Sequence, residues 1–145
     1  MITTRTVEFS YLEEQLILCK LLEGKEIDVT DVQENIEATF KLTKGERYAV
    51  MTDGRVNVTI TKEGLEAGAR PEVYIRQIAH AIVVTSIANR LIGNFIINFH
   101  KPPSPTKLFS NPESALVWLR KCIVKEKRRQ NKHSHQKNDV EINAQ

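Results

Sequence analysis

Histidine is the residue type in this sequence that is best suited to catalysis or metal binding near neutral pH. His80 and His100 are the two histidines of the first 124 residues, and they lack the spacing that places two metal ligands on one helix face. A lone histidine at a helix end more often interacts with the terminal carbonyl groups. His133 and His135 lie in a highly charged segment and are candidates for weak metal binding only, so we expect no metal site.

No catalytic motif accompanies these histidines. The sequence contains neither Gly-x-Ser-x-Gly nor His-Glu-x-x-His, and Gly64 and Gly68 lack the lysine that a phosphate-binding loop requires. Cys19 and Cys122 are too few and too far apart for a disulfide framework or a metal knuckle, which leaves them as small buried hydrophobes. We therefore expect a protein with no catalytic site and no cofactor, which is not an enzyme.

Asp53 is the candidate for a polar ligand contact. It ends the run RYAVMTD at 47–53, and a carboxylate at the C-terminal end of a central strand lies where open α/β sheets bind their ligands. The next residue is Gly54, and an Asp-Gly pair also forms a turn through the aspartate side chain. The turn is the favoured interpretation, and a ligand contact is the alternative.

The positive charge of the sequence is confined to one segment. The net charge is +3, but residues 1–119 contain 13 basic residues against 15 acidic ones, whereas residues 120–137 contain eight basic residues and only Glu126. A folded part without a positive excess argues against nucleic acid as the main ligand. The basic segment lacks aromatic residues for base stacking, and we interpret it as a solvated tail, with contact to nucleic acid or weak contact to an anionic membrane surface as the alternative.

Length and hydrophobicity predict one cytoplasmic domain. No apolar stretch approaches the length of a membrane span, and the start MITTRTVEF lacks the pattern of a signal peptide. A chain of 145 residues with 41% hydrophobic residues is long enough for one core, which we place in residues 1–124. Residues 125–145 contain few apolar side chains and are expected to be a basic, disordered tail.

Strands and helices alternate along the first 124 residues. The expected elements are a hairpin at 6–24, a helix at 28–42, a strand at 47–53, helices at 62–70 and 71–80, a strand at 81–85, a helix at 86–99, a strand at 106–110 and a helix at 112–124. Thr30 and Gln33 occupy capping-box positions, and Thr61, Ser86 and Asn111 are expected to cap the later helices. The order predicts an α/β fold: a mainly parallel sheet of four to five strands, with an N-terminal hairpin and flanking helices.

The helix at 86–99 carries more apolar surface than a core-facing helix needs. Its two apolar rows are Ile87, Leu91, Phe95 and Phe99, and Ala88, Ile92 and Ile96. Together they span about half of the circumference, whereas a surface helix needs a stripe of roughly 100°. We expect residues 87–96 to face the core for the most part, and the surplus, including Ile97, to meet a partner.

The C-terminal half of the sequence resembles a known family. Its IGNF at 92–95, KP at 101–102, PTKLF at 105–109 and ESALVWL at 113–119 are similar to small bacterial STAS-like domains of uncharacterised function. These domains are related in fold to anti-sigma factor antagonists and to CRAL-TRIO lipid-binding proteins. The order of elements agrees over residues 5–124, so the resemblance implies a STAS-like fold.

The resemblance also implies a position for regulation. In the antagonist members, a partner kinase phosphorylates a serine at the start of the helix after the second main strand. Thr59 and Thr61 match that place, although Val58 and Ile60 precede them where the antagonists have an aspartate. A helix cap is the alternative use of either threonine.

Two functions follow from these observations. The first is a non-enzymatic STAS-like interaction or regulatory module that forms a homodimer or binds a protein partner. Its interface residues would be Leu91, Phe95, Ile96, Ile97 and Phe99. The second is a carrier of a lipid or other apolar small molecule, bound under the helix at 87–99.

Overall fold

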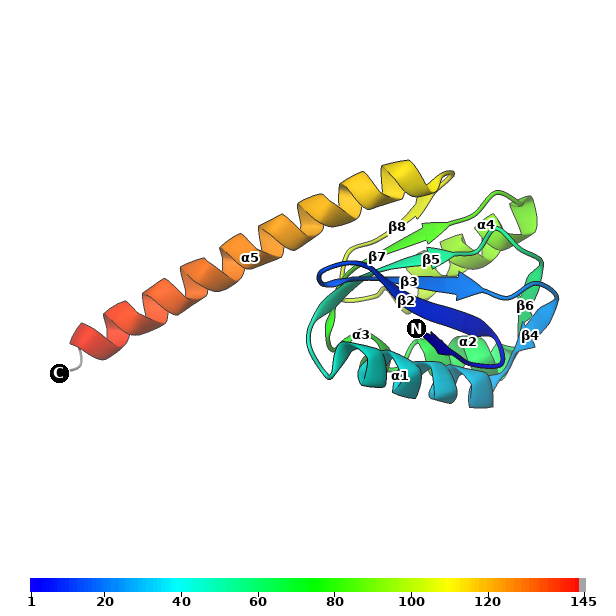
Figure 1. The fold of residues 1–145 in the computed structure, drawn as a ribbon, viewed down its shortest axis with the longest axis horizontal. Helices are drawn as coiled ribbons and strands as arrows, with labels where there is room; N and C mark the ends of the chain where they lie inside the picture. The colour runs from blue at the N-terminus through cyan, green and yellow to red at the C-terminus, as the bar shows by residue number, and fades with distance from the viewer. Residues whose placement is uncertain (144–145) are drawn as a thin grey trace.

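The computed structural model describes residues 1–143 and has three layers, with a central sheet between two layers of helices (Figure 1). The six strands follow the order β1-β2-β3-β5-β7-β8. They are β1 (Ile2–Thr3), β2 (Val7–Glu13), β3 (Leu16–Leu21), β5 (Tyr48–Asp53), β7 (Gln77–Val83) and β8 (Thr106–Phe109). Strands β1 to β3 pair antiparallel, and β3, β5, β7 and β8 pair parallel. The mainly parallel sheet with an N-terminal hairpin is confirmed, and β1 extends it by one short strand.

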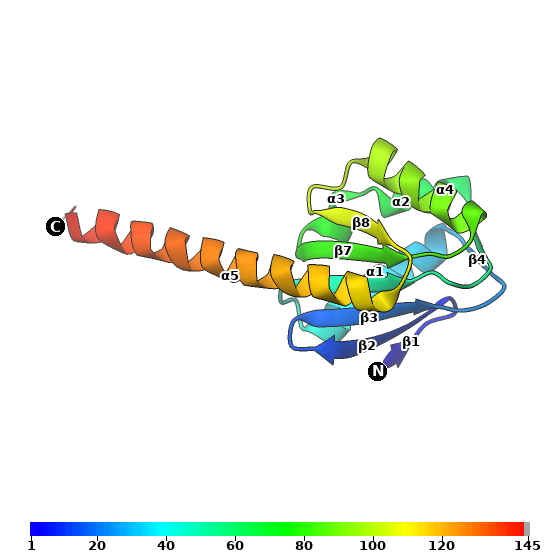
Figure 2. The same ribbon diagram turned by 90° about the horizontal axis from the view of Figure 1, so that it is seen from above.

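The helices cover both faces of the sheet and one of its edges. They are α1 (Val29–Thr43), α2 (Lys62–Gly68), α3 (Pro71–Tyr74), α4 (Ile87–Phe95), the π-helix η1 (Ile96–His100) and α5 (Pro112–Asn143). Helices α1, α2 and α3 lie on one face and the start of α5 lies on the other (Figure 1). Helix α4 lies beside the edge strand β8 (Figure 2). A separate parallel pair joins β4 (Lys25–Ile27) to β6 (Val58–Ile60).

Side chains on alternate sides of the central strands form the two cores. On one face, Ala49 and Met51 of β5 pack in a cluster with Ala115 and Leu119 of α5. The small alanines allow α5 to approach the sheet closely, which explains why α5 follows this face. On the other face, β5 presents Tyr48, Val50 and Thr52 toward α1 and α3. This second face contains the cavity described below.

Three of the four predicted helix caps are present. The side chains of Thr61, Ser86 and Asn111 accept hydrogen bonds from backbone N–H groups of the first turns of α2, α4 and α5. The capping box of α1 is formed instead by Asp28 and Asp31, each of which accepts from the other's backbone N–H at 2.9 Å. The helix begins at Val29, one residue before the predicted cap Thr30, because aspartate is a stronger N-cap than threonine.

The predicted helix at 71–80 is wrong in its second half. Helix α3 ends at Tyr74, and β7 begins at Gln77. Gln77 and Ala79 pair with β5, and all three residues 77–79 are buried in the sheet. Tertiary pairing therefore overrides the helical pattern that this segment has in isolation.

Residues 125–143 were expected to be disordered and are helical in this structure. Helix α5 continues to Asn143 and extends beyond the sheet (Figures 1 and 2). The packed part of the helix supplies the nucleus, and the Lys, Arg, Glu and Gln residues that follow favour helical backbone. Residues 144–145 lie outside the described chain. Within residues 1–143, no helix is both long enough and apolar enough to cross a membrane.

Candidate functional site

An exposed apolar row follows α4 and η1. Its members are Ile87, Leu91, Phe95 and Phe99, and their exposed fractions are 81%, 65%, 40% and 73%. The rings of Phe95 and Phe99 stack with their centroids 4.6 Å apart. Single exposed apolar side chains are common, whereas a contiguous row of large ones is a candidate contact surface. We call these four residues the α4 row.

The buried face of α4 is polar and small. Asn89 donates two hydrogen bonds from Nδ2, to the backbone carbonyls of Gly54 at 2.8 Å and Val56 at 2.7 Å. Gly93 lies so close to β8 that a Cβ at this position would be 2.6 Å from Leu108 Cδ2. Ile87, Leu91 and Phe95 of the first predicted row are exposed, so the expectation that residues 87–96 mostly face the core is wrong. Ile92 and Ile96 of the second predicted row are half-buried.

The five predicted interface residues divide into two groups. Leu91, Phe95 and Phe99 are exposed members of the α4 row, whereas Ile96 and Ile97 are half-buried. The helix changes from α to π at Ile96, and π segments frequently occur at functional sites. Lys101, with φ of 44°, ends the helix in the left-handed region.

The chain around the α4 row contains no carboxylate. Residues 73–112 include Arg90, Lys101 and other basic side chains but no Asp or Glu. A partner that covers the row therefore does not have to desolvate an acidic group of this segment.

Asp53 lies at the end of β5, as predicted. Its carboxylate accepts the backbone N–H of Arg55 at 3.2 Å and pairs with the Arg55 guanidinium at 2.9 Å. The Arg55 side chain thereby lowers the pKa of Asp53. These bonds place the carboxylate in the turn and occupy both of its oxygens.

The two threonines at the predicted regulatory position have different surroundings. Thr61 is the N-cap of α2, and its Oγ1 accepts the N–H of Gly64 at 3.0 Å. Thr59 is exposed in β6. Phosphorylation of either residue stays a prediction.

His80 and His100 lie in different elements of the fold. His100 ends η1 and lies edge-to-face with Phe95, with ring centroids 5.7 Å apart, whereas His80 lies in β7. Within residues 1–143, no three His, Cys, Asp or Glu side chains are grouped so that they could hold a metal ion.

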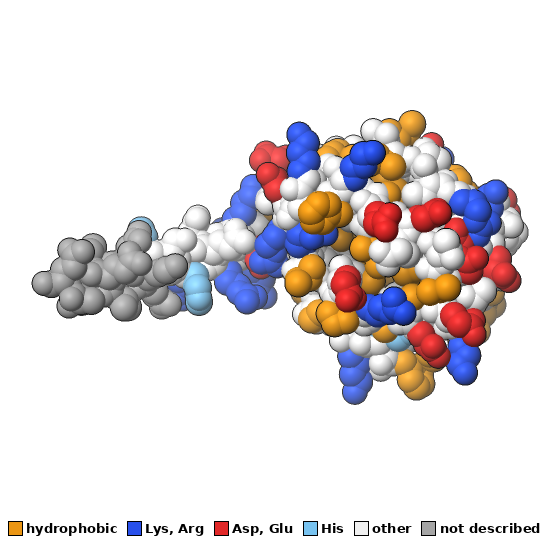
Figure 3. All heavy atoms as spheres, turned by 90° about the horizontal axis from the view of Figure 1, so that it is seen from below, with side chains coloured by type: hydrophobic (Ala, Val, Ile, Leu, Met, Phe, Trp, Pro, Cys, Tyr) orange, Lys and Arg blue, Asp and Glu red, His pale blue; other side chains and the backbone are white. Residues whose placement is uncertain are grey.

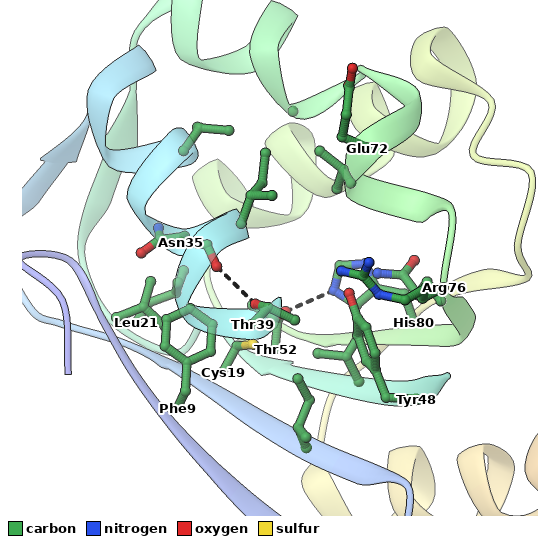
Figure 4. A pocket seen from close by; sticks show the side chains of 18 residues that line it. Phe9, Cys19, Leu21, Asn35, Thr39, Tyr48, Thr52, Glu72, Arg76 and His80 are labelled. Carbon is green, nitrogen blue, oxygen red and sulfur yellow. Dashed lines mark hydrogen bonds between the residues drawn. The ribbon is translucent and has the colours of Figure 1, made fainter. Parts of the chain in front are cut away.

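Sequence reasoning did not predict the cavity between the sheet and helices α1 to α3. Its volume is about 200 Å³, and Figure 4 shows the side chains that line it. Most of its wall is apolar and includes Phe9, Ile17 and Val50 from the sheet and Val32 and Ile36 from α1. No residue of α4 or η1 lines it.

One side of the cavity is polar. Thr52 Oγ1 and His80 Nε2 lie 2.7 Å apart on neighbouring strands and form a hydrogen bond (Figure 4). Burial lowers the pKa of His80 to about 4 and raises the pKa values of Cys19 and Tyr48 to about 12, so all three are neutral near pH 7. Polar residues at alternate positions of otherwise apolar strands were the available sequence signal for this site.

The Thr52–His80 pair brings a hydroxyl within reach of an imidazole. A histidine whose pKa is about 4 is a weak general base at neutral pH. Among the described residues, no carboxylate hydrogen-bonds the His80 ring to orient it as in a catalytic triad. We interpret the pair as two partly buried polar groups that satisfy each other.

The outer surface of the α1–α3 layer carries charges of both signs. Figure 3 shows basic and acidic side chains next to each other, with hydrophobic side chains between them. A nucleic-acid interface would be predominantly basic, whereas the surface in this view carries charges of both signs.

The sequence and the fold of the chain are each similar to those of known proteins. The model of a family described as "Domain of unknown function (DUF7793)" matches residues 10–123. The structure is similar to the crystal structure of an uncharacterized protein of the DUF3478 family with a SpoIIAA-like fold from Shewanella loihica PV-4. The TM-score is 0.59 at 12% identity, and the match covers 82% of this chain and 98% of that chain. No curated protein matches the chain. The structural similarity shows the fold alone, which is SpoIIAA-like and agrees with the STAS-like resemblance of the sequence.

Proposed function

The chain belongs to the DUF7793 family of domains of unknown function, and from its SpoIIAA-like fold and the exposed α4 row we propose that it is a non-catalytic interaction module that self-associates. The observation that carries the proposal is the exposure of Ile87, Leu91, Phe95 and Phe99 on one helix face. Burial of such side chains stabilises an association by about 25 cal/mol for each Å² of apolar surface removed from water.

The arrangement of the row supports a second copy as the partner. In an antiparallel pairing of two α4 helices, Ile87 of one copy would face Phe99 of the other, and Leu91 would face Phe95. Such a two-fold contact needs no additional complementary surface. The Arg90 side chains of the two copies would start about 9 Å apart along the helix axis, so direct charge repulsion would be modest.

The experiment that tests this proposal is sedimentation equilibrium over a range of protein concentrations. The unmodified chain should form a dimer, and Leu91→Asp should shift it to monomer because the aspartate would have to be buried at the centre of the contact. Val117→Asp is the matched control, since Val117 is 50% exposed on α5, outside the row. A monomer at every concentration, or a Leu91→Asp dimer as tight as the unmodified one, would refute the proposal.

The alternative function, a carrier with its ligand under residues 87–99, has less support. The inner side of α4 is filled by Asn89 and Gly93, which contact the loop after β5 and strand β8 directly. The cavity that could hold an apolar molecule lies instead beneath α1 and α3.

A further inference from the structure

We infer that the cavity between the sheet and helices α1 to α3 binds a small monocarboxylate with an apolar body, held by Arg76. The inference rests on the volume of the cavity, its apolar walls and the unpaired guanidinium of Arg76, the one charged basic group among the residues that line the cavity. It is independent of self-association through the α4 row, because the two sites share no residue.

The volume sets the size of the ligand. The cavity measures about 200 Å³, and an apolar protein cavity of about 150 Å³ accommodates benzene. The additional space is enough for one carboxylate on a ring or on a short alkyl chain. Phe9, Ile17 and Val50 provide apolar contact for that body.

Arg76 provides the charge. It follows α3 and borders the cavity, and its guanidinium carbon lies 4.4 Å from the centroid of the Phe40 ring, which fixes the planar group on one side. None of the ion pairs formed by the described residues includes Arg76, and its buried Nε–H has no hydrogen-bond partner among them. A buried guanidinium N–H without a partner requires an explanation, and a carboxylate matches its planar fork of donors.

The neighbouring groups leave this charge uncompensated. Glu72 also borders the cavity, but it is exposed, and Figure 4 shows its carboxylate directed away from Arg76. His80 and Tyr48 are neutral near pH 7, so they can offer hydrogen bonds but no charge. The cavity therefore combines an apolar interior with one cationic group, which selects for an amphipathic anion.

The test uses benzoate and hexanoate as probes, with benzamide and hexanol as neutral analogues, in calorimetric titrations of the full chain. We expect saturable binding of at least one acid, weaker binding of its neutral analogue, and a rise in the melting temperature with acid concentration. Arg76→Gln should weaken acid binding about tenfold or more, since a charged hydrogen bond is lost. Arg70→Gln is the matched control, because Arg70 is exposed and does not border the cavity.

A second variant keeps the test valid if Arg76→Gln disturbs the fold. Cys19→Leu enlarges a side chain in the cavity wall without changing a charge, and it should reduce the binding of acids and neutral analogues alike. The inference is overturned if neither acid binds, if the neutral analogues bind as tightly as the acids, or if Arg76→Gln binds the acids unchanged. The monomeric Leu91→Asp variant should bind the acids normally, which separates this result from the outcome for self-association.

Discussion

The stability of the domain should depend on pH through His80. Burial lowers the pKa of this histidine from 6.5 to about 4, because the charged imidazolium would lose its hydration between the sheet and the helices. In the unfolded chain the side chain returns to its ordinary pKa. The unfolded state therefore binds one more proton between pH 6.5 and pH 4, and the free energy of unfolding must fall as the pH drops through that window.

The size of the effect follows from the two pKa values. One pKa unit corresponds to about 1.4 kcal/mol, so the loss should be about 2 kcal/mol at pH 5 and about 3 kcal/mol at pH 4. Above about pH 7 the histidine should contribute no pH dependence. Asp31 acts in a different window: its folded pKa is lowered to about 2 by Arg5, so its contribution is lost only as the pH falls from about 4 toward 2.

Urea unfolding followed by circular dichroism at pH 7, 6 and 5 measures this dependence. We expect the free energy of unfolding to fall by about 2 kcal/mol between pH 7 and pH 5 in the unmodified chain, and much less in His80→Gln. The control variant His133→Gln, at an exposed position of α5, should keep the full dependence. A flat profile in the unmodified chain, or an equal fall in His80→Gln, would refute the assignment of a buried neutral histidine.

Three further predictions concern other described contacts. Gly64→Ala should reduce the free energy of unfolding by about 1–3 kcal/mol, because the new Cβ would lie 2.9 Å from a backbone carbonyl oxygen of β4. Gly68→Ala places its Cβ in open space and should not reduce the free energy of unfolding, and chemical denaturation of the two variants compares them directly. The Cys19 thiol, whose pKa is raised to about 12 by burial, should react with iodoacetamide at pH 8 much more slowly in the folded chain than after urea unfolding. Mass spectrometry of the Cys19 peptide measures the two rates, and equal rates would contradict the raised pKa. Asp31→Asn should reduce the free energy of unfolding by about 1–3 kcal/mol at pH 7, because the ion pair with Arg5 is lost. Its difference from the unmodified chain should shrink at pH 3, and a constant difference would argue against the lowered pKa.

Most of the fold could be predicted because its signals are local. The caps at Thr61, Ser86 and Asn111 and the apolar run before Asp53 depend on residues close together in the sequence. The start of β7 could not be predicted in the same way, because residues 77–79 become strand only when they pair with strands distant in sequence. The helix beyond residue 125 was missed for another reason: absence of apolar residues excludes a packed core, but it does not exclude a helix that is nucleated elsewhere.

The cavity was missed because no single segment contains it. Thr52 and His80 come from different strands, Arg76 follows α3, and the apolar walls come from β2, β3, β5 and α1. Each polar residue has an ordinary explanation within its own segment. Only the pairing of β5 with β7 places the Thr52 hydroxyl and the His80 ring on the same face and within hydrogen-bonding distance.

The orientation of helix α4 could have been predicted from the spacing of two of its residues. Asn89 and Gly93 are four residues apart and therefore lie on the same side of the helix, away from the α4 row. An asparagine that bonds two backbone carbonyls and a glycine that permits close approach to Leu108 can hold a helix without burying its large apolar side chains. Since the attachment of α4 does not use Ile87, Leu91 or Phe99, their hydrophobicity is not required for packing within the domain. We had assigned this apolar row to the core. Because packing within the domain does not require it, its hydrophobicity is the strongest argument for our proposal that the α4 row contacts a partner.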